Sequence, residues 1–117
     1  MRDFRELVVW QKAHSLTLAV YETTVTFPRS ELFGLTSQVR RCSASIAANL
    51  AEACGRGGDR EFARFCTIAI GSASELEYHL LLARDLALIK LDHYADLSQR
   101  TTEVKRMLTV LRRKADG

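Results

Sequence analysis

The sequence contains little proline, glycine or cysteine. One proline and six glycines occur in 117 residues, and so few turn-forming residues argue against a β-sandwich or a barrel with many turns. The three cysteines are odd in number, form no C-x-x-C pair and have no histidine at ligand spacing, so neither a disulfide framework nor a structural zinc site is expected. No run approaches the roughly eighteen apolar residues that a membrane span requires, and no membrane association is expected.

The residues that are present suit one folded domain over residues 1–117. Hydrophobic residues make up 47% and charged residues 26% of the chain, a composition that excludes intrinsic disorder. Area scaling for a chain of this size buries about two-thirds of its surface, which needs no metal or disulfide. The start of the chain lacks a signal-peptide pattern, and three cysteines without a pairing pattern favour reduced thiols and a cytoplasmic protein.

Apolar residues recur at helical spacing in four segments, which span about residues 7–25, 30–53, 59–86 and 92–114. Short breaks separate these segments, so the expected fold is all-α, an antiparallel up-down four-helix bundle. The expected N-caps of the last three helices are Ser30, Asp59 and Asp92.

The first helical segment carries two neighbouring stripes that together predict a broad buried face. One stripe consists of Leu7, Trp10, His14, Thr17 and Tyr21, and the other of Val9, Ala13, Leu16 and Val20. His14 is accordingly interpreted as a core or interface histidine rather than a ligand.

The second segment carries a polar stripe of Gln38, Arg41, Ser45, Asn49 and Glu52. The stripe is about 80° wide on a helix and lies beside a set of alanines, where a surface helix would place long lysine and glutamate side chains. We interpret it as a helix–helix or subunit interface in which an Arg–Glu pair, amides and hydroxyls satisfy one another. The alternative is a solvent-exposed face that is small and polar.

The third segment has a matching patch that includes Gly71, Ser72 and Glu75. Glycine inside a helix costs about 1 kcal/mol relative to alanine, and close backbone packing is the expected compensation. Ser72 and Glu75 are therefore assigned to the same interface, and Glu75 or Glu77 is expected to pair with an arginine of the second segment, either within the chain or across subunits.

The net charge of +3 and the pI of about 9.0 permit contact with nucleic acid without requiring it. Basic residues gather around the second turn, which joins the second and third helical segments, and near the C-terminus. The candidates for phosphate contact are Arg40, Arg41, Arg56, Arg60, Arg64, Lys105, Arg106, Arg112, Arg113 and Lys114. The alternative is that these are ordinary solvated basic helix ends, since no aromatic residues interleave with them for base stacking.

No catalytic residue, metal site or cofactor is expected. Glu75 and His79 are one helical turn apart, but the chain has no Glu-x-x-His motif of the kind that di-iron bundles use in pairs. Nothing in the sequence places a nucleophile beside a histidine. Arg56-Gly-Gly58 is too short for a phosphate-binding loop and lacks the Lys-[Ser/Thr] that follows one.

The segments Asp3–His14, Arg40–Glu52 and Gly71–Glu77 together resemble the proteins encoded within 23S rRNA intervening sequences, also described as 23S ribosomal-type proteins. This chain has Ala53 where that family usually has glycine, and Ile70 where it usually has arginine. The resemblance implies a four-helix bundle that forms a ring-like homo-oligomer, a pentamer, with no enzyme activity and with RNA or DNA as partner.

Two functions therefore stand as hypotheses. The first is an oligomeric bundle that binds RNA or DNA through phosphate contacts. The second is an assembly or scaffold protein that acts through a protein partner and has no role with nucleic acid. A ligand-binding or metal-binding bundle is a weaker third.

Overall fold

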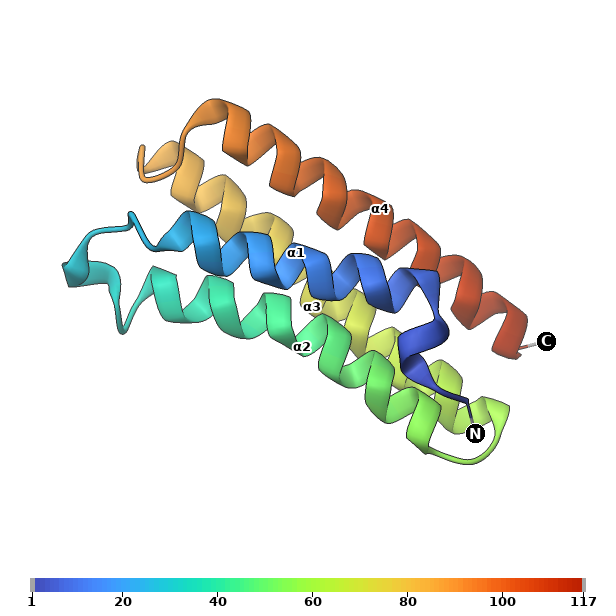
Figure 1. Cartoon of the computed structure of the whole chain (residues 1–117). Coiled ribbons are helices and arrows are strands. Elements are labelled where there is room, and N and C mark those ends of the chain that lie inside the picture. The colour runs from blue at the N-terminus through green and yellow to red at the C-terminus, as the bar shows by residue number, and fades with distance from the viewer. Residues whose placement is uncertain (1, 117) are drawn as a thin grey trace.

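The computed structural model describes residues 2–116. Within that range the chain forms four long helices, α1 (Val8–Thr24), α2 (Leu35–Gly55), α3 (Asp59–Asp85) and α4 (Leu91–Asp116). Single 3-10 turns, Phe4–Glu6 and Arg29–Glu31, precede α1 and α2. Consecutive helices run in opposite directions (Figure 1), so the predicted up-down four-helix bundle is confirmed.

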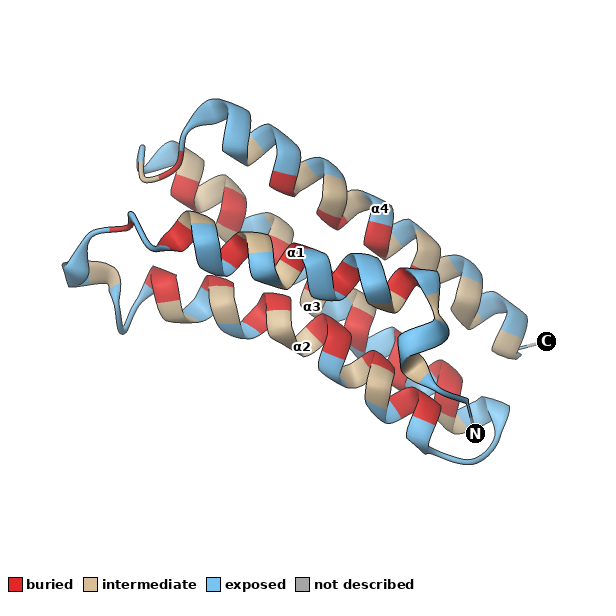
Figure 2. Cartoon of the chain, viewed as in Figure 1, coloured by how far each residue is buried: buried red, intermediate tan, exposed pale blue. Residues whose placement is uncertain are grey.

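The core lies along the inward sides of the helices (Figure 2). α3 packs along both α2 and α4, and α1 closes the bundle between those two helices. Each fully buried leucine or isoleucine stabilises the fold by about 1.5–3 kcal/mol relative to an exposed one. The largest buried side chains include Leu16, Ile46, Leu50, Leu76, Leu80 and Leu108.

The prediction of a broad buried face on α1 is wrong for the single chain. The stripe that begins at Val9 is buried, whereas His14 and Tyr21 of the other stripe are exposed and Trp10 is half-buried. α1 contacts only α2 and α4 among the other long helices, and one stripe is enough to fill that groove. His14 is therefore not a core residue, and its ring stacks on Trp10 with centroids 5.0 Å apart.

The predicted N-caps lie close to the helix starts but do not act as caps. Ser30 belongs to the 3-10 turn, and α2 begins later, where a Glu31 carboxylate oxygen accepts a hydrogen bond of 3.2 Å from the amide of Leu35. Asp59 and Asp92 each lie inside the first turn of their helix, where the helix dipole favours a carboxylate. The residue that precedes α3 is Gly58, whose φ of 85° would strain any residue other than glycine.

No helix within residues 2–116 combines the length and the apolar character needed to cross a lipid bilayer.

Candidate functional site

The predicted polar stripe lies partly in the outer seam between α2 and α3. The hydroxyl groups of Ser45 on α2 and Ser72 on α3 share a hydrogen bond of 2.8 Å. The side-chain amide of Asn49 donates to the carbonyl oxygen of Ser45 at 2.8 Å and to its hydroxyl at 2.9 Å. The predicted network of small polar groups therefore forms within one chain, between two of its own helices.

The charged members of the stripe do not join this network. Glu52 pairs at 3.4 Å with Arg56, the residue that follows α2, rather than with Arg41. Arg41 and Gln38 are exposed, and their side chains make no hydrogen bond or ion pair to any residue of the described range 2–116. On a helical wheel Arg41 lies at the edge of the stripe that is further from Cys42, the buried residue of α2 that meets Glu75 and His79 of α3.

The predicted pairing of Glu75 or Glu77 with an arginine of α2 is wrong within the chain. Glu75 lies 3.2 Å from the Nε2 atom of His79, one turn further along α3. Glu77 accepts a hydrogen bond of 2.7 Å from the Nζ atom of Lys105 on α4. α4 is the nearer neighbour on that side of α3, so it supplies the cation.

Gly71 does not pack closely against another part of the chain, as was expected. It is exposed, and a Cβ atom built on it meets no atom within 4 Å. Close backbone packing within residues 2–116 therefore does not compensate for the glycine. A helix surface with this open space remains available to a neighbouring molecule.

The same seam brings together Cys42, Glu75 and His79, which the sequence interpretation did not connect. One ligand-type atom from each of the three residues lies within 4.8 Å of the other two. Burial, and then the nearby Glu75 carboxylate, raise the pKa of the Cys42 thiol to about 12. Spacing along the chain carries no signal for this cluster, because Cys42 and His79 belong to different helices.

Six of the ten basic candidates converge on one end of the bundle. The N-terminal segment, the turn between α2 and α3 and the C-terminal end of α4 all lie there (Figure 1). The charges of Arg2 and Arg112 both act on the pKa of Cys66, which places these two arginines near the same buried thiol. Arg56 and Arg64 both lie over the ring of Phe65. Sequence reasoning missed Arg2 and Arg5, because only the antiparallel packing brings the N-terminus to this end.

Ion pairs within the chain neutralise some of these cations. Arg5 pairs with Asp3 at 3.2 Å, Arg56 with Glu52 at 3.4 Å and Arg64 with Glu61 at 2.9 Å. The remaining basic side chains at this end have no ion-pair partner within the described part of the chain. We call them the free basic end, which consists of Arg2, Arg60, Arg112, Arg113 and Lys114.

The other four basic candidates lie elsewhere, and one of them, the exposed Arg41, follows Arg40 on α2. Arg40 is at the opposite end, where its Nε atom donates to the Thr24 hydroxyl at 2.8 Å and its guanidinium lies over the ring of Tyr21. Lys105 is bound to Glu77, and the exposed Arg106 lies in the middle of α4. The grouping of Arg40 with the second turn is therefore wrong, because α2 spans the length of the bundle between them.

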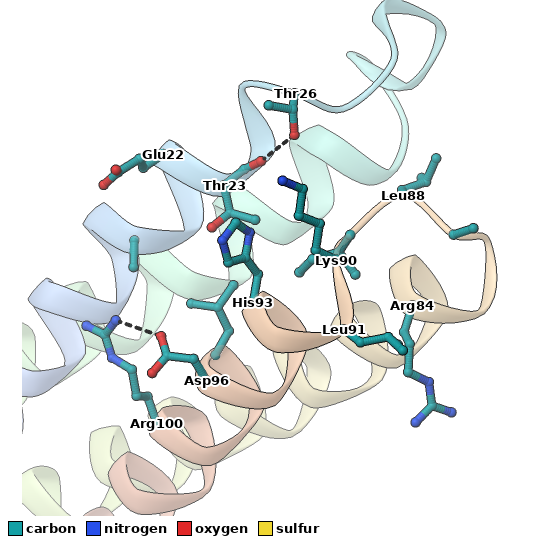
Figure 3. A pocket seen from close by; sticks show the side chains of 14 residues that line it. Glu22, Thr23, Thr26, Arg84, Leu88, Lys90, Leu91, His93, Asp96 and Arg100 are labelled. Atoms are coloured by element: carbon teal, nitrogen blue, oxygen red, sulfur yellow. Dashed lines mark hydrogen bonds and ion pairs between the residues drawn. The ribbon is translucent and has the colours of Figure 1, made fainter.

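A groove of about 950 Å³ lies between the C-terminal end of α1 and the start of α4. Figure 3 shows both acidic and basic side chains around it, with Glu22 on α1 and Lys90, His93 and Asp96 near the start of α4. Arg100 is held by Asp96 at 3.4 Å and by the Ser15 hydroxyl at 2.8 Å. Charges of both signs line the groove, so the groove does not select an anionic or a cationic ligand.

These features define a small all-helical bundle with a polar seam on one outer face and a basic end. A model of the family described as 23S rRNA-intervening sequence protein matches residues 5–110. The chain belongs to this family, which confirms the resemblance seen in its sequence.

A solved structure supports the same assignment. It is the crystal structure of a protein of unknown function from the S23 ribosomal protein family of Bacteroides thetaiotaomicron VPI-5482. The two chains are 26% identical and superpose with a TM-score of 0.80, covering 89% of this chain and 97% of the other. No functionally curated protein matches the chain significantly.

Proposed function

We propose that this protein is a non-enzymatic, cytoplasmic homo-oligomer, a pentameric ring, that binds RNA or DNA through phosphate contacts. The observation that carries the proposal is the convergence of the free basic end from three separate parts of the chain. Phosphates are bound by unpaired arginine and lysine side chains. A ring repeats this end once per subunit, so a modest charge on each chain becomes a multivalent field.

The outer surfaces of the bundle support assembly. The outer face of α1 exposes apolar side chains, with Leu18 58% and Tyr21 44% exposed beside the half-buried Trp10. α2 and α3 instead present small groups, among them the exposed Ala48 and Gly71. Two different surfaces on one subunit permit a head-to-tail contact, which closes into a ring when the rotation between subunits is suitable.

The assembly is tested by measuring the solution mass by light scattering. We expect a mass well above the 13.2 kDa of one chain at micromolar concentration. Asn49→Leu should lower that mass while leaving the helical content unchanged, because a large aliphatic group replaces a compact amide at the seam. Gln99→Leu, on the exposed side of α4, is the matched control. A wild-type protein that remains monomeric would disprove the ring.

RNA binding is tested on the same samples by titration with salt. Binding through phosphates should weaken steeply between about 50 and 200 mM salt. The double variant Arg60→Glu/Arg113→Glu should lower the affinity by at least about tenfold. The control Arg29→Glu/Lys90→Glu makes the same change in charge at the opposite end and should have little effect. No retention of RNA at low salt, or equal losses in both variants, would contradict the proposal.

One observation favours a scaffold function instead. Phe33, in the connection between α1 and α2, is 93% exposed, and the neighbouring Leu32 and Val25 are also exposed. Exposed apolar side chains that gather at one place are typical of protein interaction sites. If the protein is a scaffold, a protein partner should co-purify with it and its affinity should change little with salt.

A further inference from the structure

The strongest chemistry outside the basic end is the cluster of Cys42, Glu75 and His79 in the α2–α3 seam. Glu75 and His79 lie one turn apart on α3, so their side chains project to the same side. The Nε2 atom of His79 is 3.2 Å from a carboxylate oxygen of Glu75. Cys42 projects from α2 toward the same place, and all three ligand-type atoms lie within 4.8 Å of one another.

These distances fit a small divalent cation. Ligands that bind zinc at about 2.0–2.3 Å in a tetrahedron are about 3.3–3.8 Å apart. The separation of 3.2 Å between His79 and Glu75 is close to the lower end of this range. A shift of about 1 Å in the flexible Glu75 side chain or in the thiol closes the remaining distance, which is within the reach of side-chain rotation.

The histidine has an unused partner position. Its side chain is only 15% exposed, and its Nδ1 atom is buried with no hydrogen-bond partner in the described range. An unpaired buried polar atom costs about 1–3 kcal/mol. Within the described range the only hydrogen-bond partner of this ring is Glu75, at Nε2, and Nε2 is the nitrogen that faces the proposed ion.

The three donors also select the metal. A thiolate and an imidazole favour zinc over calcium or magnesium, which prefer oxygen ligands. One thiolate and one carboxylate balance the two positive charges of the ion, so the bound cluster is neutral in the half-buried seam. Three protein ligands leave a fourth position open to water.

We propose that Cys42, Glu75 and His79 bind one zinc ion per chain between α2 and α3. The Cys42 thiol, which donates to the carbonyl oxygen of Val39 at 3.5 Å in the free protein, releases its proton to solvent as the sulfur–metal bond forms. The ion then joins the two helices beside the contact between Ser45 and Ser72. The site is independent of the proposed binding of nucleic acid, which uses the end of the bundle.

The test uses the reduced, metal-free full chain and Co²⁺ as a spectroscopic substitute for zinc. We expect one Co²⁺ per chain, with thiolate-to-cobalt charge-transfer absorption and the strong visible bands of a tetrahedral site. Zn²⁺ should displace Co²⁺ and raise the melting temperature. Cys42→Ser should abolish the charge-transfer absorption and weaken zinc binding by at least about 100-fold.

Two controls keep the test decisive. Cys54→Ser removes another buried thiol, which lies away from the cluster near Arg2, and should leave cobalt binding unchanged. If Cys42→Ser fails to fold, His79→Gln takes its place, with His93→Gln as its matched control. Absence of the charge-transfer absorption in the wild-type protein, or its persistence in Cys42→Ser, would overturn the proposal.

Discussion

The hydroxyl groups of Ser45 and Ser72 lie 2.8 Å apart and join the middle of α2 to the middle of α3. Short side chains at both positions allow the two helices to meet through hydroxyl groups rather than through leucine side chains. Asn49 fixes the Ser45 hydroxyl from one turn further along α2. This contact determines which polar groups remain free on the outer face of the seam.

The serine pair should contribute measurably to stability. Ser72→Ala should lower the free energy of unfolding by about 1 kcal/mol, because it removes one net hydrogen bond, and Ser45→Ala should cost at least as much, because it also removes the bond from Asn49. The double variant should cost about as much as Ser45→Ala alone, since the two serines share one bond. Urea unfolding at one fixed protein concentration measures the free energy of unfolding of the wild type, the two single variants and the double variant, which together form a double-mutant cycle. Ser74→Ala, on the exposed side of α3, serves as the control, and strictly additive losses would show that the contact contributes nothing.

The variant Gly71→Ala tests two properties separately, the stability of one chain and the assembly of several chains. Within one chain the new methyl group meets open space, so helix propensity alone should stabilise α3 by up to about 1 kcal/mol. If another subunit packs on this surface, the same methyl group should lower the solution mass. Thermal unfolding and light scattering on one sample measure both effects. A more stable protein with an unchanged mass would place Gly71 outside the subunit interface.

Substitution of the buried residue Thr36 should stabilise the protein. Its hydroxyl has no hydrogen-bond partner in the described part of the chain, and it is only 4% exposed. Thr36→Val should therefore raise the free energy of unfolding by about 1 kcal/mol, because it removes a desolvated hydroxyl that has no partner.

Thr101→Val is the matched control for that change. Thr101 is fully buried, but its hydroxyl donates to the carbonyl oxygen of Leu97 at 2.7 Å. The same substitution should therefore lower the free energy of unfolding by about 1 kcal/mol. Chemical denaturation measures both variants, and a loss of stability in Thr36→Val would contradict the interpretation.

The buried thiols should destabilise the protein at alkaline pH. Burial raises the pKa of Cys42 from 9.0 to about 12, and burial followed by the nearby Cys54 raises the pKa of Cys66 from 9.0 to about 11. As pH rises, the thiols of the unfolded chain ionise before those of the folded protein. The contribution of the buried thiols to the free energy of unfolding is therefore complete below the unfolded pKa of 9.0 and is lost as pH rises through the folded pKa.

Within that window each thiol should lower the free energy of unfolding by about 1.4 kcal/mol per pH unit. Cys66→Ala should therefore lose stability less steeply than the wild-type protein as pH rises from 9.0 to about 11. Denaturant unfolding across this range gives both slopes. Parallel curves for the two proteins would show that Cys66 ionises equally well in the folded and unfolded states.

The periodicity of apolar residues was sufficient to predict four helices and their antiparallel order, because it depends on local spacing and short connections. The helix starts were displaced by one to several residues, most clearly at Ser30. A 3-10 turn after Pro28 and the Glu31 side chain compete with a simple cap there. Such competition depends on backbone geometry that the sequence pattern does not show.

The polar stripe was recognisable from the sequence, but the partners of its residues were not. Spacing on a helix places Ser45, Asn49 and Glu52 on one face, yet it does not say whether that face meets α3, another subunit or water. The structure pairs Ser45 with Ser72 and leaves Glu52 with Arg56. The distance between helices and their rotation decide these pairings.

The sequence by itself determined the four amphipathic helices, because the periodicity of an apolar face depends only on residues that are close together along the chain. Only the tertiary structure decided which α1 stripe is buried, that the chain termini and the second turn share one basic end, and that Cys42 meets His79. These relations join residues that are distant along the chain. They follow from how the helices rotate to fill a common core, which no single segment specifies.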